Sequence, residues 1–211
     1  MDEPEQIVRK LLEVAGTTYA ADAGIRMSDK PMPLFQLLVL CMLASKPIAA
    51  TTAVHAAREL FKTGLRTPKA VLASDRSTMI SAFGRAHYVR YDESSATRLT
   101  DVAQRVRDEY SGDLRKLARR SGHDVRAAKR MLKEFNGIGN TGADIYLREV
   151  QDVWTWVRPY FDDRAVAAAK QLGLPTDPAA LGNLAPPANA CLAAALVRTA
   201  LDNDVRRQVI N

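Results

Sequence analysis

The chain has 211 residues and a formal net charge of +6, with 30 Lys and Arg against 24 Asp and Glu. Because 47% of the residues are hydrophobic, a sizeable core can form, which excludes an intrinsically disordered chain. The basic excess favours an anionic partner, and nucleic acid is the leading class of such partners.

The two cysteines, Cys41 and Cys191, lie in apolar helical contexts. This predicts small buried side chains in a reducing compartment rather than a disulfide, and two cysteines cannot supply the four ligands of an iron–sulfur cluster. The charged N-terminal segment lacks the apolar core of a signal peptide. The strongest apolar stretch, residues 34–44, is about half as long as a membrane span. We therefore expect a cytoplasmic protein, nucleoid-associated if its source is bacterial.

Hydrophobic residues recur with helical periodicity along most of the chain, and no pair of segments shows the alternation of paired strands. The predicted fold class is therefore all-α. An opening helix is expected around residues 7–15, and residues 16–33 read as a looser connection that Pro31 and Pro33 close. Further helices are expected at 34–45, 52–62, 68–73, 94–110, 124–135, 141–150, 163–172, from 177, and at 187–201.

Capping chemistry sets several of these boundaries. Thr67 before Pro68 is a good N-cap followed by proline at the first helical position. Gly173 is expected to end the helix that starts at Asp163. Within the helices, the residues predicted to face the core include Val54, Ala57, Phe61, Leu99, Val102 and Val106.

The positive charge is concentrated between Arg105 and Glu134. Ten Lys and Arg in this stretch oppose five Asp and Glu, which leaves +5 of the total of +6. A charge run is commonly just a solvated helix face. This one leads directly into a glycine-rich turn, which makes it a candidate field for an anionic ligand.

That turn, residues 135–144, reads FNGIGNTGAD between two predicted helices. Gly137 and Gly139 allow a tight turn and a close approach of a ligand to the backbone. Gly139, Asn140 and Thr141 then open a helix, whose first amides have no internal partners and carry the positive end of the helix dipole. The pattern predicts a phosphate site. An ordinary glycine-rich turn between packed helices is the alternative.

The segment 135–143 resembles the helix-hairpin-helix signature of the endonuclease III superfamily of base-excision DNA glycosylases. Residues 161–174 are similar to that family's catalytic-aspartate segment and the helix that follows it. Residues 34–46 look like the helix that opens the family's helical barrel. The resemblance runs from about residue 30 to residue 200, and the hairpin followed by the aspartate is its specific part.

The resemblance implies two helical lobes that flank a DNA-binding cleft. One would be a helical-barrel lobe over residues 30–149, and the other would combine residues 1–29 with 150–211. The implied activity is that of a monofunctional DNA glycosylase, which hydrolyses the N-glycosidic bond of a damaged base in double-stranded DNA. We expect a monomer without a membrane partner.

Breaking a base–sugar bond develops positive charge on the deoxyribose, and a nearby carboxylate stabilises that charge. The resemblance assigns this role to Asp162, while a register shifted by one residue assigns it to Asp163. The alternative is that both aspartates only cap the helix that follows them.

Bifunctional members of the family carry a lysine where this chain has Thr141, and threonine has no amine to form a Schiff base. Lys46 lies where the family places a residue near the gap left by the extruded base. It is a candidate DNA contact, a substitute amine or an ordinary exposed lysine. Arg85 and Arg90, in a loop predicted around Gly84, are weaker candidates for phosphate contacts. The DNA-binding candidates are together Gly137, Gly139, Asn140, Thr141, Gly142, Lys46, Arg85 and Arg90.

The three histidines show no metal-ligand spacing, so we expect no metal site and no cofactor. The resemblance adds only a monovalent cation held by hairpin carbonyls. Trp154 and Trp156 are candidates either for a base pocket or for the core. Three other functions stay open: a non-catalytic damaged-DNA-binding protein of the same fold, a bifunctional glycosylase and lyase with a relocated lysine, and an all-helical adaptor protein.

Overall fold

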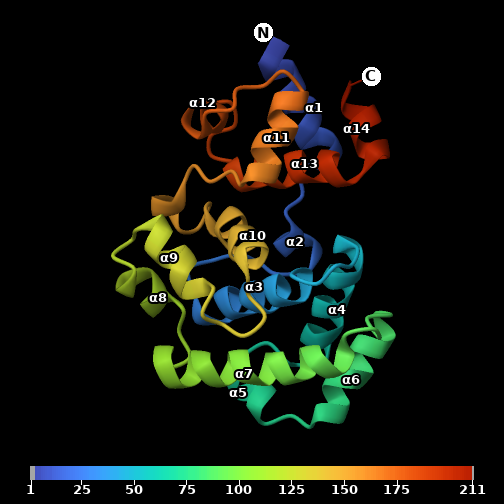
Figure 1. Ribbon diagram of the computed structural model, residues 1–211, viewed down its shortest axis with the longest axis vertical. Coiled ribbons are helices and arrows are strands. Elements are labelled where there is room, and N and C mark those ends of the chain that lie inside the picture. Colours follow the sequence, from blue (N-terminus) through green and yellow to red (C-terminus); the bar gives the residue numbers. More distant parts are fainter. Residues whose placement is uncertain (1–2, 211) are drawn as a thin grey trace. The chain divides into compact units, whose positions relative to one another are not determined.

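The computed structural model describes residues 3–210, and every regular element in this range is a helix (Figure 1). The predicted all-α class is confirmed. The internal contacts divide the chain into two compact units. Unit 1 contains the described residues up to Tyr19 and those from Leu147 onward, and unit 2 is Ala20–Tyr146.

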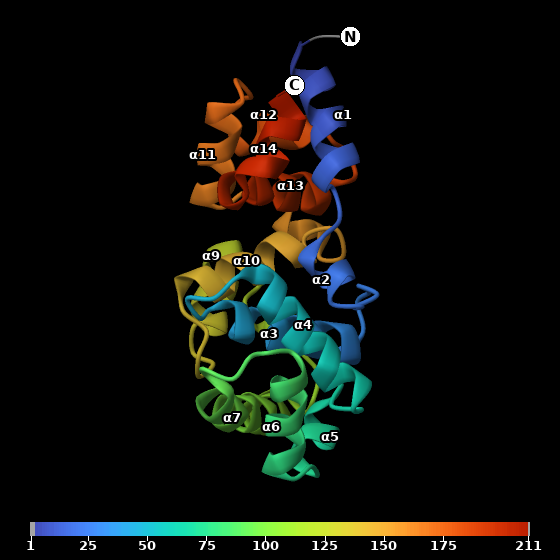
Figure 2. The same cartoon turned by 90° about the vertical axis from the view of Figure 1, so that its right-hand side faces the viewer.

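Unit 2 is built around helix α3 (Pro31–Ala44), which is buried continuously from Pro33 to Leu43. Helices α4 and α7 pack against α3, α5 packs on α7, and α6 contacts both α4 and α7 (Figure 2). The other helices of unit 2 are α4 (Ala50–Lys62), α5 (Pro68–Leu72), α6 (Arg76–Arg85), α7 (Asp92–Tyr110), α8 (Arg115–Arg120) and α9 (Val125–Leu132). Two helices cross the boundary between the units: α2 (Tyr19–Asp22) and α10 (Asn140–Val150).

Helix α3 begins earlier than the sequence predicts. We expected Pro31 and Pro33 to close the preceding connection, but both lie in the first turn of the helix. The first amides of a helix have no internal acceptor, so prolines there forfeit no hydrogen bond. With 14 residues, α3 is too short for a bilayer, and no helix within residues 3–210 is long and apolar enough to cross one.

Unit 1 is built around helix α13 (Asn189–Leu201), which is buried at most of its positions. Helices α1, α11 and α14 all pack against it. The elements that complete this unit are α1 (Glu3–Ala15), the 3-10 turn η1 (Thr155–Val157), α11 (Asp163–Gln171), α12 (Pro178–Asn183) and α14 (Asn203–Ile210).

The capping and core predictions are confirmed. The Thr67 hydroxyl accepts a hydrogen bond from the Ala70 amide at 3.2 Å, and Gly173 follows α11 in the left-handed conformation at φ +72°. Six residues predicted to face inward are all buried: Val54, Ala57, Phe61, Leu99, Val102 and Val106. Neither cysteine forms a disulfide within the described residues, and only Cys41 is fully buried.

Four helices have no counterpart in the sequence prediction: α2, α6, α8 and α14. Helix α8 buries only Leu117 and Ala118, so it is too short for a periodic apolar pattern to develop. The loop predicted around Gly84 is wrong, because Gly84 lies inside α6 and Arg85 is the last residue of that helix. Gly84 is exposed, and a single glycine is tolerated within a helix because the packing of its neighbours outweighs its weak helix propensity.

Candidate functional site

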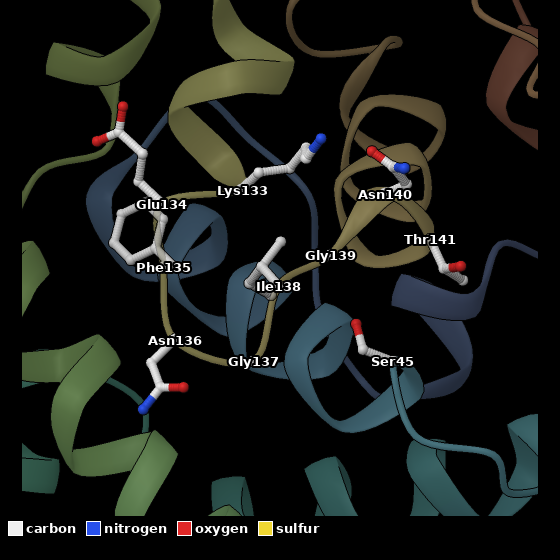
Figure 3. A pocket seen from close by; sticks show the side chains of 10 residues that line it. All are labelled: Ser45, Lys133, Glu134, Phe135, Asn136, Gly137, Ile138, Gly139, Asn140 and Thr141. Atoms are coloured by element: carbon white, nitrogen blue, oxygen red, sulfur yellow. The ribbon is translucent and has the colours of Figure 1, made fainter.

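The turn between α9 and α10 borders an open depression of about 520 Å³ in unit 2 (Figure 3). The depression is lined by the consecutive residues 133–141 and by Ser45, which directly follows α3. The predicted glycine-rich turn is therefore at the surface and open to a ligand.

Four consecutive backbone amides at the start of α10 find no acceptor within the described part of the chain. They belong to Gly139, Asn140, Thr141 and Gly142, whereas the next amide, that of Ala143, donates to the Gly139 carbonyl at 3.0 Å. The side chains of Asn140 and Thr141 are exposed, and the space beside the Gly139 Cα is empty. The backbone amides of Gly139, Asn140 and Thr141 and the positive end of the α10 dipole thus lie together at the depression.

Side chains of α7 and α3 pack against the turn at Gly137. Gly137 has φ +89°, and a Cβ at this position would lie 2.9 Å from Arg98 Cδ and 3.3 Å from Met42 Cγ. Glycine is thus needed there both for its conformation and for its lack of a side chain. The Asn136 amide donates to the Asp101 carboxylate on α7 at 2.6 Å, which ties the turn to that helix.

The entry to the turn is fixed by one arginine of the basic run. The Arg105 guanidinium donates to the carbonyl of Glu134 at 2.5 Å and to its carboxylate at 2.6 Å. It also lies 5.4 Å from the ring centre of the buried Phe135, which stacks on Tyr110 with centroids 5.8 Å apart. Arg105 therefore holds the turn and is not free to bind a ligand.

Gly142 has a packing role that the sequence did not suggest. It is buried, and a Cβ there would lie 2.4 Å from Ser45 Oγ and 3.4 Å from the Cys41 carbonyl. The Ser45 hydroxyl itself donates to that carbonyl at 2.7 Å. Glycine at this position lets α10 approach the end of α3 closely. A contact between DNA and the Gly142 amide stays a prediction.

The basic run is only partly neutralised. Four of its ten basic side chains form ion pairs with acids: Arg105, Arg107, Arg115 and Lys129. The other six make no ion pair within residues 3–210, and all but the first of them are exposed: Lys116, Arg119, Arg120, Arg126, Arg130 and Lys133. Lys133 lines the depression, so uncompensated positive charge extends along α8 and α9 up to the hairpin.

The structure brings Lys46 and Arg90 together, but not Arg85. Lys46 Nζ and the Arg90 guanidinium lie 5.1 and 5.3 Å from the ring centre of Tyr91. Burial, and to a smaller extent the charge of Arg98, lower the pKa of the Lys46 amine. Arg85 instead donates to Glu59 at 2.9 Å in an exposed ion pair.

The two candidate catalytic aspartates, both in unit 1, have different surroundings. Asp162 is the N-cap of α11, and its Oδ1 accepts a hydrogen bond from the Ala165 amide at 2.9 Å. Its Oδ2 accepts one from Arg148 at 2.5 Å, and the two side chains are 10% and 4% exposed. Asp163 is exposed in the first turn of the helix. Asp162 therefore caps α11 and is held in place, whereas Asp163 faces solvent. That capping is the only role of Asp162 stays a prediction.

Two buried residues near Asp162 were missed by the sequence analysis: Arg148 and Gln151. Their signal is polar residues at the otherwise apolar end of the predicted helix 141–150, where Arg148 lies, and directly after it, where Gln151 lies. The two tryptophans in the same unit stack on each other, with centroids 5.4 Å apart and ring planes at 22°. Trp154 is buried and Trp156 is half-buried.

No model of a known protein family matches this sequence, and none of the curated proteins matches it. The resemblance therefore depends only on the sequence motifs described above, of which the hairpin and the aspartate segment are the specific part. In the described range of the chain, no group of three or more His, Cys, Asp or Glu side chains could hold a metal ion.

Replacing Gly142 by alanine should destabilise the protein by about 1–3 kcal/mol, because the new methyl group would overlap Ser45 Oγ. Adding Ser45→Ala should recover part of this loss. Gly84→Ala is the matched control, since a Cβ there meets nothing within 4 Å and alanine is the better helix former. Urea unfolding followed by circular dichroism measures all three. A Gly142→Ala variant as stable as Gly84→Ala would contradict the close approach of α10 to α3.

Lys46 should react with an acylating reagent faster than Lys62 in mildly alkaline buffer. Its lowered pKa leaves a larger fraction as the neutral, nucleophilic amine, whereas Lys62 is held in an ion pair with Glu59 at 2.7 Å. Arg98→Met should slow the reaction at Lys46 by removing a like charge. Mass spectrometry of the partly labelled protein gives both rates, and equal rates would show that the environment of Lys46 is ordinary.

Proposed function

We propose that this chain is a base-excision DNA repair protein of the helix-hairpin-helix type. Its activity would be that of a monofunctional DNA glycosylase acting on a damaged base in double-stranded DNA. The observation that carries the proposal is the row of amides at Gly139, Asn140 and Thr141, which find no acceptor within residues 3–210 and lie on an open depression. The resemblance of the hairpin and aspartate motifs supplies the link to base excision.

A DNA phosphate fits the chemistry of the hairpin. Its oxygens would accept hydrogen bonds from the Asn140 and Thr141 amides, where the helix dipole adds favourable charge. The empty space beside Gly139 would let a phosphate oxygen reach the backbone. The exposed Thr141 hydroxyl is a further donor, and Lys133 lies on the same depression.

The six cations of α8, α9 and the hairpin that make no ion pair within the described residues would interact with phosphates further along the backbone. Each lysine or arginine that neutralises a phosphate releases about one counterion, so binding should weaken steeply as salt is added. Such contacts would anchor and orient the duplex without reading its sequence. This interface would account for the uneven distribution of charge, which an adaptor protein would leave unexplained.

Asp162 is the better candidate for stabilising the developing sugar cation. A carboxylate has about four acceptor sites, and the Ala165 amide and Arg148 occupy two of them. The remaining sites could face a sugar or a water molecule. A fixed carboxylate needs little reorganisation when charge develops, which is the main source of electrostatic catalysis. Asp163 is exposed, and no restraint of this kind holds it within residues 3–210.

Two observations favour competing functions. The ion pair with Arg148 offsets part of the negative charge of Asp162, which favours a damaged-DNA-binding protein that performs no chemistry. The lowered pKa of Lys46 favours a lyase activity, because a neutral amine can attack the aldehyde of an abasic site. The assays below separate these alternatives.

Thr141→Asp should weaken binding to a duplex with an abasic-site analogue by about tenfold or more, because it places a negative charge where the phosphate would lie. The matched control is Thr51→Asp, since Thr51 is also exposed and is the second residue of α4 in the same unit. Both substitutions are compatible with the start of a helix. Fluorescence anisotropy at several salt concentrations measures the affinities. Equal effects of the two substitutions would remove the hairpin from the interface.

Asp162→Asn should reduce base release by about a hundredfold or more and leave DNA binding intact, because asparagine keeps the cap but lacks the charge. Asp163→Asn should have little effect. The assay is single-turnover incubation with a panel of lesion-bearing duplexes, in which strand breaks after alkali report base loss.

The same assay distinguishes the alternatives. Breaks that need alkali support the monofunctional glycosylase. Breaks without alkali, together with a borohydride-trapped adduct that Lys46→Arg abolishes, would establish the lyase. Binding without base release across the whole panel would leave a non-catalytic DNA-binding protein.

A further inference from the structure

We infer that two buried polar residues, Arg148 near the end of α10 and Gln151 directly after it, position the Asp162 carboxylate for its part in base excision. The inference rests on the proposed function. All the contacts that carry it lie within unit 1.

Arg148 fixes one oxygen of the carboxylate. It is 3% exposed and donates to Asp162 Oδ2 at 2.5 Å. Its Nε lies 3.9 Å from Glu149 Oε1, and its guanidinium lies 5.7 Å from the ring centre of Tyr19. Arg198 lies 4.2 Å from the same ring. Arg148 is thus held among carboxylates and an aromatic ring, and it has little freedom to release Asp162.

Gln151 fixes the backbone that leads to Asp162. It is completely buried, and its Oε1 accepts a hydrogen bond from the Tyr160 amide at 2.8 Å. Its Nε2 donates to the carbonyls of Tyr160 and Arg148 at 2.9 and 3.0 Å. The side-chain amide therefore pairs with both backbone groups of the residue two before Asp162 and links them to α10.

A capping aspartate does not by itself need buried partners such as Arg148 and Gln151, which together we call the framework of Asp162. Asp124 and Asp177 cap α9 and α12 through bonds of 2.7 and 2.8 Å to the amides of Ala127 and Ala180. Both are exposed and make no ion pair within residues 3–210. Of these three capping aspartates, only Asp162 is restrained by a buried arginine and by a buried side-chain amide that holds the preceding backbone.

This difference identifies what the framework does. Burying an ion pair costs desolvation and is often no more stabilising than apolar packing, so its benefit lies in defining one geometry. With Oδ1 held by the Ala165 amide, Oδ2 by Arg148 and the preceding backbone by Gln151, the carboxylate has a single orientation. Catalytic groups lose rate steeply when displaced by about 1 Å. Arg148 and Gln151 should therefore affect turnover more than DNA binding.

Hydrogen exchange at the Ala165 amide tests the positioning without any assay of activity. In Arg148→Lys and in Gln151→Met this amide should exchange about tenfold faster than in the parent protein, because its acceptor is no longer held. The Ala180 amide, capped by Asp177 in the same unit, should not change. Arg158→Lys is the matched control, because Arg158 pairs with Asp152 at 3.0 Å and does not contact Asp162. Lysine keeps the buried positive charge, so the variant should fold.

The same variants are then compared in the single-turnover assay. Arg148→Lys and Gln151→Met should lower the rate of base release by about tenfold or more and change the Kd for DNA less than about twofold. Two results would overturn the inference. One is that the Ala165 amide exchanges equally fast in the variants and the parent protein. The other is that the parent protein is active and the variants release the base at the same rate. Faster exchange at Ala165 in a chain whose parent releases no base would support the positioning of Asp162 and contradict the proposed function.

Discussion

The close approach of α10 to the end of α3 is the constraint on which the hairpin depends. A Cβ at Gly142 would lie 2.4 Å from Ser45 Oγ, so the first turn of α10 reaches its position only because this residue has no side chain. The carbonyl of Cys41 and the hydroxyl of Ser45 satisfy each other at the contact. The amides of Gly139–Thr141 are thereby left at an open surface rather than against a neighbouring helix.

The basic side chains between Arg105 and Lys133 have two roles: some hold the hairpin through ion pairs, and others leave positive charge at the surface. Arg105 fixes the backbone and carboxylate of Glu134 at the entry to the turn, and Lys129 pairs with Asp144 on α10. Their charges are used to hold the hairpin. The unpaired cations lie in the same stretch and provide a positive field that would be screened by salt at distances beyond about 10 Å. One basic segment thus both builds the turn and attracts an anion to it.

The surroundings of Asp162 combine two requirements that usually compete. A carboxylate that caps a helix is most stable when its oxygens are satisfied, while one that stabilises a cation must keep capacity for a ligand. The Ala165 amide and Arg148 use one direction on each oxygen, which leaves further acceptor sites on both. Arg148 at the same time reduces the net negative charge. Free acceptor sites on Asp162 favour catalysis, and the positive charge of Arg148 opposes it. The balance between the two decides whether the protein releases a base or only binds DNA.

The sequence by itself determined the helical class, the capped start at Thr67 and the glycine-rich turn, because periodicity, caps and turns depend on neighbouring residues. Short helices such as α8 were missed, since two buried residues cannot establish a period. Only the tertiary structure decided that Gly142 is a packing residue, that Arg85 pairs with Glu59, and that Arg148 meets Asp162. These contacts join residues 14 to 97 positions apart in the chain. No local pattern specifies them, because they depend on how whole helices pack.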